Sequence, residues 1–232
     1  MRGEEKRRYV RGMFGRIVAR YDLMNSLMTL GRDRAWREWT VEAAGAEPGK
    51  LALDVATGTG ELALALARRG CRTLGLDYVE AMLKAADGKN AALPEMTRPI
   101  YVAGDALALP FADGAFDCLT TGFALRNVIG IPAALAEMTR VLKPGGRLAC
   151  LELTPPRGRH FPFFFDLYFG RLVPLLGALV AGNREAYAYL PASLRGFPTA
   201  EELAEMMREA GCRRVTFRRL MFGTIALHVG EK

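Results

Sequence analysis

The chain has 232 residues, of which 50% are hydrophobic and 25% are charged. This length suits one domain, and the composition is that of a globular protein, which excludes a disordered or fibrous chain. The formal net charge of +7 fits three interpretations: a solvated basic surface, attraction to anionic lipid, or binding to nucleic acid.

The cysteines and histidines indicate neither a disulfide framework nor a metal site. The four cysteines lie far apart in the sequence, and the two histidines have no cysteine pair beside them. We therefore expect no metal and a reduced, cytoplasmic compartment. The first residues also lack the apolar run of a signal peptide. The cysteines are Cys71, Cys118, Cys150 and Cys212.

Residues 1–45 predict a cap of two or three short helices, because apolar side chains recur there at helical spacing. From Leu51 onward, short apolar runs alternate with amphipathic segments. Such alternation predicts a parallel sheet with helices on both faces. We expect strands over 51–56, 72–77, 99–105, 116–123 and 147–153, and helices over 61–70, 79–90 and 132–146.

A helical insertion is predicted over 155–198, where this alternation stops. Residues 161–182 are apolar for about the length of a membrane span, but Asp166, Arg171 and two prolines oppose spanning. Three interpretations stay open: core packing, a groove for an apolar tail, or a membrane-contacting patch flanked by arginines. The side chains concerned are Phe161, Phe163, Phe164, Phe165, Tyr168 and Phe169, with Arg157, Arg159 and Arg171.

The C-terminal part predicts one more helix and two strands. Residues 199–211 form an amphipathic pattern that begins at a capping Thr199 and ends at Gly211. Residues 212–220 and 223–232 have the pattern of an antiparallel pair. We therefore expect a mostly parallel sheet with an antiparallel C-terminal strand, within one domain over 1–232.

The sequence LALDVATGTGEL over 51–62 is the most informative segment. A strand leads to Asp54, then Gly58 and Gly60 make a tight turn, and a helix follows. Glycine tolerates positive φ and lets a ligand approach the backbone closely. Because open α/β sheets bind ligands at the carboxyl ends of their strands, we expect a ligand at this turn. Asp77 ends the next strand, where a carboxylate can accept both hydroxyls of a ribose.

Two ligand classes compete for this turn, since GTGELA also satisfies the dinucleotide pattern G-x-G-x-x-G/A. An acid at Asp54 would repel a pyrophosphate, but it can hold the ammonium of a methionine moiety. Asp105, followed by Ala106, comes after the third strand and supplies an acid for an adenine amine. These acids favour S-adenosylmethionine (SAM) over a dinucleotide.

Arg126 and Asn127 follow the fourth strand, where the acceptor of a methyl group is expected. The D/N-P-P-Y/F sequence that marks methylation of base amines does not occur in the chain, nor does an aromatic and basic stacking platform. We therefore expect a small-molecule acceptor and no nucleic-acid partner.

The chain resembles the ubiquinone/menaquinone biosynthesis C-methyltransferases over nearly its whole length. The resemblance lies in the opening MFGRIVARYDLMNSLMTLGRDRAWRE, the loop LDVATGTGEL, the central DALALPFADGAFDCLTTGFALRNV, and the later RVLKPGGRL and YLPASLRGFPTAEELAEMMREAG. RYDLMN and GFALRNV are specific to the family, whereas RVLKPGG is shared by many methyltransferases. Two positions depart from the family pattern: Asp33 stands near a usual histidine, and Glu61 replaces a usual aspartate.

The resemblance implies a class I SAM methyltransferase with a Rossmann-like sheet. Its acceptor would be a polyprenylated quinol methylated on a ring carbon, and we favour 2-demethylmenaquinol over the ubiquinone-pathway benzoquinol. It further implies that Arg126 and Asn127 belong to the catalytic pocket. SAM contacts carry over to Thr59, Asp77, Asp105, Ala106 and Gly122, beside Asp54, Gly58 and Gly60 of the glycine turn.

The chemistry of such an acceptor suggests a role for the Arg-Asn pair. A phenol titrates near 10, so a nearby cation must favour the phenolate that activates the ring carbon. Our hypothesis is that Arg126 stabilises this phenolate, directly or through a water, while Asn127 orients the ring. Because arginine keeps its proton, a water or another acid must accept the proton of the hydroxyl.

Other interpretations stay open at this point. The acceptor could be another small molecule, or the chain could be a SAM-binding scaffold without catalysis. A peripheral contact with an anionic membrane and a homodimer are further partners that the sequence permits.

Overall fold

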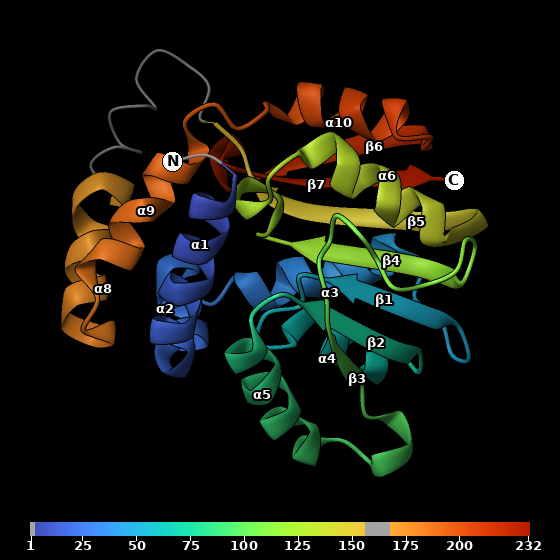
Figure 1. Ribbon diagram of the computed structural model, residues 1–232, viewed down its shortest axis with the longest axis horizontal. Coiled ribbons are helices and arrows are strands. Elements are labelled where there is room, and N and C mark those ends of the chain that lie inside the picture. The colour runs from blue at the N-terminus through green and yellow to red at the C-terminus, as the bar shows by residue number, and fades with distance from the viewer. Residues whose placement is uncertain (1–2, 156–167) are drawn as a thin grey trace.

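The computed structural model describes residues 3–155 and 168–232, and these contain a seven-stranded sheet (Figure 1). The strand order is β3-β2-β1-β4-β5-β7-β6, with β7 antiparallel to both of its neighbours and all other pairs parallel. The predicted sheet is therefore confirmed. The strands are β1 Leu51–Val55, β2 Arg72–Asp77, β3 Ile100–Ala103, β4 Phe116–Gly122, β5 Leu142–Leu153, β6 Arg213–Leu220 and β7 Ile225–Glu231.

Helices cover both faces of this sheet, as the alternating pattern predicts. In Figure 1, α3 and α4 lie behind the strands, and α6 and α10 lie in front of them. The central strands β1, β4 and β5 are buried along most of their length, which is why apolar residues predominate in their buried stretches. A few polar side chains there are buried too: Asp54, Thr120 and Glu152. The helices are α3 Asp33–Ala43, α4 Glu61–Arg68, α5 Glu80–Lys89, α6 Ile131–Val141 and α10 Ala200–Glu209.

A second group of helices stands beside the sheet and has a small core of its own (Figure 1). Met13 of α1, Met24 and Met28 of α2, Val173 of α8 and Tyr187 of α9 pack together there. The predicted domain limits, a cap over 1–45 and an insertion over 155–198 in one domain, stay predictions. This group consists of α1 Glu4–Ile17, η1 Val18–Arg20, α2 Tyr21–Thr29, η5 Tyr168–Leu172, α8 Val173–Ala181 and α9 Arg184–Leu194.

One predicted boundary is wrong. The helix expected over 132–146, with Pro-Gly-Gly as its stop, ends earlier, at Val141, and β5 already begins at Leu142, which pairs with Phe116 of β4. The backbone of Leu142 is already extended, with φ −74° and ψ 141°, and Lys143 precedes Pro144, which disfavours the helical conformation at Lys143. The stop signal is real, but the helix ends before it.

The insertion is only partly described. The aromatic side chains Phe161, Phe163, Phe164 and Phe165, with Arg157 and Arg159, lie outside the described residues. Across 3–155 and 168–232, no helix is both long enough and apolar enough to cross a bilayer.

The capping residue of α10 offers a test of local stability. The Thr199 hydroxyl accepts the backbone N–H of Glu202, and the Glu202 carboxylate accepts the N–H of Thr199 at 2.7 Å. We expect Thr199→Ala to lower the free energy of unfolding by about 1 kcal/mol. Chemical denaturation measures the change, with Thr199→Ser as the control that keeps the hydroxyl. Equal loss in both variants would contradict a capping role.

Candidate active site

The glycine turn after β1 combines an open position with a crowded one. Gly58 and Gly60 both have positive φ, at 55° and 81°. A Cβ added at Gly58 would meet nothing within 4 Å, whereas one at Gly60 would collide with Tyr101 and lie 2.9 Å from Cβ of Ala86. Gly58 therefore leaves room at the carboxyl edge of the sheet. Gly60 lets α4 start close to Tyr101 and Ala86, which is a packing role. The sequence pattern alone does not distinguish a glycine needed for packing from one needed for close approach of a ligand.

The Asp54 carboxylate joins this turn to two strands. One oxygen accepts the hydroxyl of Thr57 at 2.6 Å, and the other accepts the hydroxyl of Thr120 in β4 at 2.7 Å. The side chain is buried, and burial raises the pKa of Asp54 to about 7. If Asp54 also binds the ammonium group of the methionine moiety, as expected, its two oxygen atoms must accept that group in addition to these two hydroxyl groups.

A cavity of about 130 Å³ lies beside the turn, at the ends of β1, β2 and β4. Asp77 is on its wall, with one oxygen accepting the N–H of Gly58 at 2.7 Å and the other accepting the N–H of Val79 at 2.8 Å. Burial raises the pKa of Asp77. A smaller cavity of about 40 Å³ adjoins it at Gly122 and is lined by Asp54 and Thr59. We call the two together the donor cavity.

Most of the predicted cofactor residues meet at the donor cavity. Gly58, Asp77, Asp105, Ala106 and Gly122 line its larger part, and Asp54 and Thr59 line the smaller part. Gly60 is the exception, since it lines neither part. The structure therefore brings together acids that are 23 and 28 residues apart in the sequence (Asp54 to Asp77, and Asp77 to Asp105).

The N-terminal helix α1 covers the donor cavity, which the sequence does not reveal. Val10 and Phe14 line it, and the Arg7 guanidinium forms an ion pair with Asp105 at 2.9 Å. On the same helix, the ammonium of Lys6 donates to the backbone oxygen of Arg126 at 3.0 Å. Burial lowers the pKa of Lys6. Helix α1 thus contacts both the predicted adenine site and the turn that carries the Arg-Asn pair.

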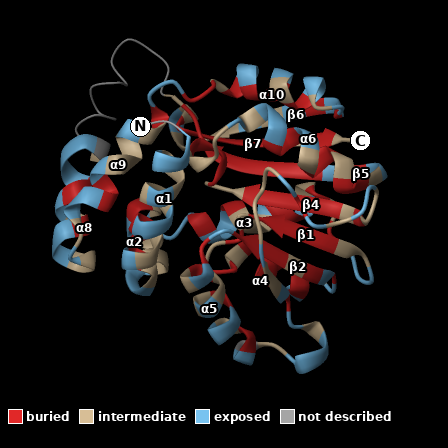
Figure 2. Ribbon diagram, viewed as in Figure 1, coloured by how far each residue is buried: buried red, intermediate tan, exposed pale blue. Residues whose placement is uncertain are grey.

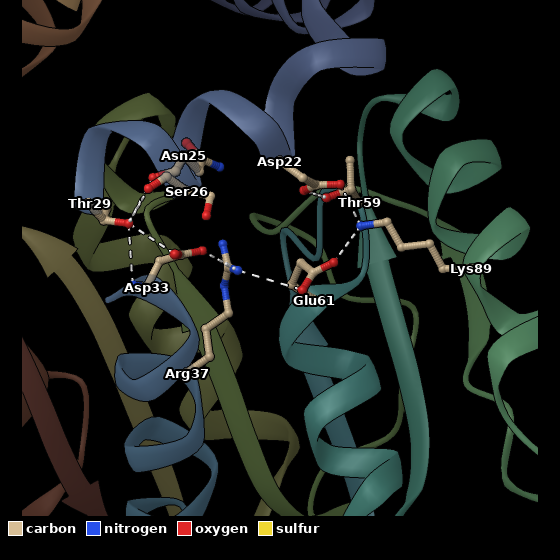
Figure 3. Close-up of polar contacts among 9 residues, drawn as sticks. All are labelled: Asp22, Asn25, Ser26, Thr29, Asp33, Arg37, Thr59, Glu61 and Lys89. Carbon is tan, nitrogen blue, oxygen red and sulfur yellow. Dashed lines mark hydrogen bonds and ion pairs between the residues drawn. The ribbon is translucent and has the colours of Figure 1, made fainter. Parts of the chain in front are cut away.

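A chain of charged side chains joins α2 and α3 to the glycine turn (Figure 3). The Thr59 hydroxyl donates to Asp22 of α2 at 2.6 Å, and Lys89 binds both Asp22 and Glu61 at 2.6 Å. Arg37 of α3 then lies 3.6 Å from Glu61 and 2.7 Å from Asp33. The RYDLMN segment therefore holds the turn through Asp22. The two positions that depart from the family pattern, Asp33 and Glu61, both belong to this chain.

A second cavity, of about 280 Å³, lies under α2 and is almost entirely apolar. Trp36, Leu153 and Leu190 are on its wall, and Asp33 and Arg126 bring charge to it. We call it the acceptor cavity. Phe123 is the residue that this cavity shares with both parts of the donor cavity. The two cavities therefore meet where β4 ends.

Arg126 is buried at the wall of the acceptor cavity and is already paired. Its Nη1 donates to Glu152 at the end of β5 and to the backbone oxygen of Phe123, each at 2.6 Å. Its Nε is buried and has no hydrogen-bond partner among the described residues. Glu152 is a functional candidate that sequence analysis missed, although a single acid in the apolar strand LACLEL was an available signal.

The structure separates Asn127 from Arg126. Asn127 lines the donor cavity and not the acceptor cavity, and its buried Oδ1 has no hydrogen-bond partner in the described part of the chain. The short 3-10 turn η4, Leu125–Asn127, sends the two side chains to different cavities. A role for Asn127 in orienting the acceptor ring is therefore not what the geometry favours.

The residues of the donor cavity fit SAM. Asp77 keeps a lone pair on each oxygen for ribose hydroxyls, and Asp105 can accept from an amine. Val79 and Met82 supply an apolar wall for a flat ring. The unpaired Oδ1 of Asn127 is a buried acceptor that a bound donor group would satisfy.

Comparison with known proteins identifies the family. The model of the ubiE/COQ5 methyltransferase family matches residues 1–232. The chain belongs to this family. It is 46% identical to a demethylmenaquinone methyltransferase of Roseiflexus castenholzii, over 99% of this chain and 95% of that protein. It is 42% identical to a ubiquinone/menaquinone biosynthesis C-methyltransferase, UbiE, of Paracoccus denitrificans, over 99% of this chain and 92% of that protein.

The ubiE/COQ5 chain also has the fold of known methyltransferases. A SAM-dependent methyltransferase from Thermotoga maritima superimposes with a TM-score of 0.64 at 20% identity, over 95% of this chain and 99% of that one. The protein is thus a SAM-dependent methyltransferase, as the resemblance implied. The roles of its individual site residues are proposals, which the geometry above supports.

The buried Asp54 carboxylate predicts a pH dependence of stability. Its pKa is raised from about 4 in the unfolded chain to about 7 in the fold. Between these values the folded state binds the extra proton, so the free energy of unfolding contributed by Asp54 falls as the pH rises. Asp54→Asn keeps the size of the side chain and removes the titration. It replaces one acceptor oxygen by an amide donor, as protonation of Asp54 also does.

Denaturation without SAM at several pH values between about 4 and 7 measures this contribution. We expect the difference between the wild-type protein and Asp54→Asn to grow as the pH rises, in favour of the variant. A difference that stays constant with pH would show that Asp54 does not titrate in this range.

Proposed function

We propose that this enzyme transfers the methyl group of SAM to a ring carbon of a polyprenylated quinol, with 2-demethylmenaquinol as the acceptor. The Roseiflexus relative is named for demethylmenaquinone, which supports a naphthoquinol. The Paracoccus relative is named for both ubiquinone and menaquinone biosynthesis, which supports the benzoquinol as the second candidate.

The observation that carries the proposal is the acceptor cavity and its position. An aromatic ring with an apolar tail needs an apolar enclosure, and its hydroxyl groups need a few polar partners. The acceptor cavity provides apolar walls with Arg126 and Asp33 among them. Because it meets the donor cavity at Phe123, a ring bound there would lie next to the methyl donor. Methyl transfer is an in-line displacement, so placing the two reactants accounts for much of the catalysis.

Arg126 is the proposed catalytic cation. SAM, when bound, supplies a methyl group activated by a positive sulfur. The enzyme must favour the phenolate of the acceptor, and the buried guanidinium can do so through its unpaired Nε. Glu152 and the backbone oxygen of Phe123 fix the orientation of Arg126. Because arginine does not accept the proton, we assign that role to a water or to Asp33, the carboxylate on the cavity wall. The methylated ring carbon must then lose its own hydrogen as a proton to restore the aromatic ring. The same acceptor returns the first proton to the quinol oxygen and takes this one, so that one proton is released in each turnover.

The proposed role of Asn127 follows its position. Its Oδ1 lines the donor cavity, so we propose that it helps to bind SAM and does not orient the quinol ring. The cytoplasmic location and the homodimer stay predictions.

The choice of acceptor is tested by methyl transfer from labelled SAM under reducing conditions. Demethylmenaquinol and a demethoxy-type benzoquinol are compared side by side, each with the purified enzyme. We expect faster transfer to demethylmenaquinol. Faster transfer to the benzoquinol would replace the first candidate by the second, and transfer to neither, with SAM binding intact, would reject a quinol acceptor.

The role of Arg126 is tested by separating turnover from cofactor affinity. Arg126→Gln removes the charge while keeping a polar side chain, and we expect kcat to fall by a factor of about 100 or more. The dissociation constant of SAM should change little, because Arg126 does not line the donor cavity. Arg140→Gln serves as a control, since this arginine pairs with Asp113 and Glu137 away from both cavities. Parallel loss of SAM binding and turnover in Arg126→Gln would contradict the proposal.

A further inference from the structure

Helices α2 and α8 carry a cluster of exposed leucines. Leu23 and Leu27 of α2, and Leu175 and Leu179 of α8, are each four residues apart, a spacing that puts both members of a pair on one side of their helix. Leu30 at the cap of α2 and Leu172 in η5 are a third exposed leucine beside each pair. Leu30 and Leu179 are 79% and 76% exposed, and much of the outer side of α8 is exposed in Figure 2. We call the six side chains the leucine surface: Leu23, Leu27 and Leu30 of α2 and its C-terminal cap, and Leu172, Leu175 and Leu179 of η5 and α8.

Packing inside the protein does not explain the leucine surface. The two helices already bury another side, where Met24 and Met28 of α2 meet Val173 of α8 in the small core. Single exposed leucines are normal on a protein surface, but two stripes on helices in contact mark an interaction site.

Both stripes begin at the rim of the acceptor cavity. Leu30 itself lines the cavity and is exposed to solvent. Tyr168 also lines it, and its hydroxyl donates to the backbone oxygen of Met28 at 2.8 Å. Leu172 follows Tyr168 in the same turn η5. The apolar lining of the cavity therefore continues onto the surface along both helices.

Exposed arginines accompany these stripes. None of them forms an ion pair with another described residue, whereas the nearby acids Asp22 and Asp33 are paired with Lys89 and Arg37. The exposed Glu185 follows Arg184 and accepts a hydrogen bond from Tyr9, so it offsets one of the five arginine charges. The region thus presents apolar side chains together with a net positive charge. Such a surface is complementary to a bilayer that has anionic headgroups. The arginines are Arg20, Arg32, Arg34, Arg171 and Arg184.

We infer that the leucine surface docks on an anionic bilayer, with the acceptor cavity opening toward the lipid. The identity of the acceptor rests on the proposed function, but the docking depends only on the leucines and arginines. A polyprenyl tail leaving the cavity past Leu30 would stay in hydrocarbon and would not have to cross water. The enzyme would then draw its acceptor directly from the membrane.

Vesicle binding tests the inference in the absence of any acceptor. The purified full chain is mixed with vesicles of phosphatidylglycerol and phosphatidylcholine, or of phosphatidylcholine alone, and the bound fraction is measured by flotation. We expect binding to the anionic vesicles. Leu175→Glu/Leu179→Glu should weaken it by about tenfold or more, because two carboxylates would enter the apolar boundary and face anionic headgroups.

A matched control variant makes the same chemical change elsewhere. Met96→Glu/Ile100→Glu also alters two exposed apolar positions, but these lie in η3, Glu95–Thr97, and at the start of β3. We expect this variant to bind anionic vesicles like the wild-type protein. Unchanged SAM affinity in both variants shows that the donor cavity stays folded.

Three outcomes would overturn the docking. The two double variants could bind anionic vesicles equally well, or the wild-type protein could fail to bind them. A wild-type dimer that Leu175→Glu/Leu179→Glu turns into a monomer, without vesicle binding, would show that a second copy covers the surface. The proposed function can fail separately. If the enzyme methylates neither quinol but still binds anionic vesicles, and Leu175→Glu/Leu179→Glu still weakens that binding, the docking stays supported.

Discussion

The buried carboxylate of Asp54 holds together the part of the sheet from which both cavities are built. Its two oxygen atoms accept hydroxyl groups from the glycine turn and from β4, so the ends of β1 and β4 keep a fixed separation. The donor cavity lies beside this junction. Phe123, which follows β4, lines both the donor cavity and the acceptor cavity. Parallel strands supply the geometry, because their carboxyl ends meet at one edge. The relative position of the two cavities therefore depends on a carboxylate that is itself buried and hydrogen-bonded within the sheet.

Much of the sheet was predictable, since the buried part of each central strand is mainly apolar and each crossover helix has its own periodicity. The acids at the ends of β1, β2 and β3 were predictable for the same reason: a strand end is visible in the sequence, and parallel strands bring such ends together. The end of α6 was not predictable. Pro-Gly-Gly shows that a helix cannot extend beyond it, but the helix can end several residues earlier, as α6 does at Val141. The pairing of Leu142 with Phe116 decides that point, and it joins residues that no local pattern connects.

The polar contacts around the two cavities were the least predictable part of the site. Arg7 pairs with Asp105, Asp22 with Thr59, and Arg126 with Glu152, and in each case the partners are distant in the sequence. From sequence alone, a charged side chain in an amphipathic helix is predicted to be exposed to solvent, because its partner in the fold is not known. Adjacent residues can also be separated in the structure. Arg126 and Asn127 are neighbours in the sequence, yet a single 3-10 turn directs their side chains into different cavities.

Helix α1 has a consequence for how the protein folds. Lys6 contacts the backbone of Arg126, which lies 120 residues further along the chain, so this segment leaves the ribosome long before its binding surface exists. Contacts of such high sequence separation form late, because closing a long loop costs entropy before any contact repays it. Helix α1 can therefore make this contact only after the turn that follows β4 has been synthesised and has folded. An incomplete chain would have an open donor cavity, and activity would begin only when the N-terminal segment has returned to the finished sheet.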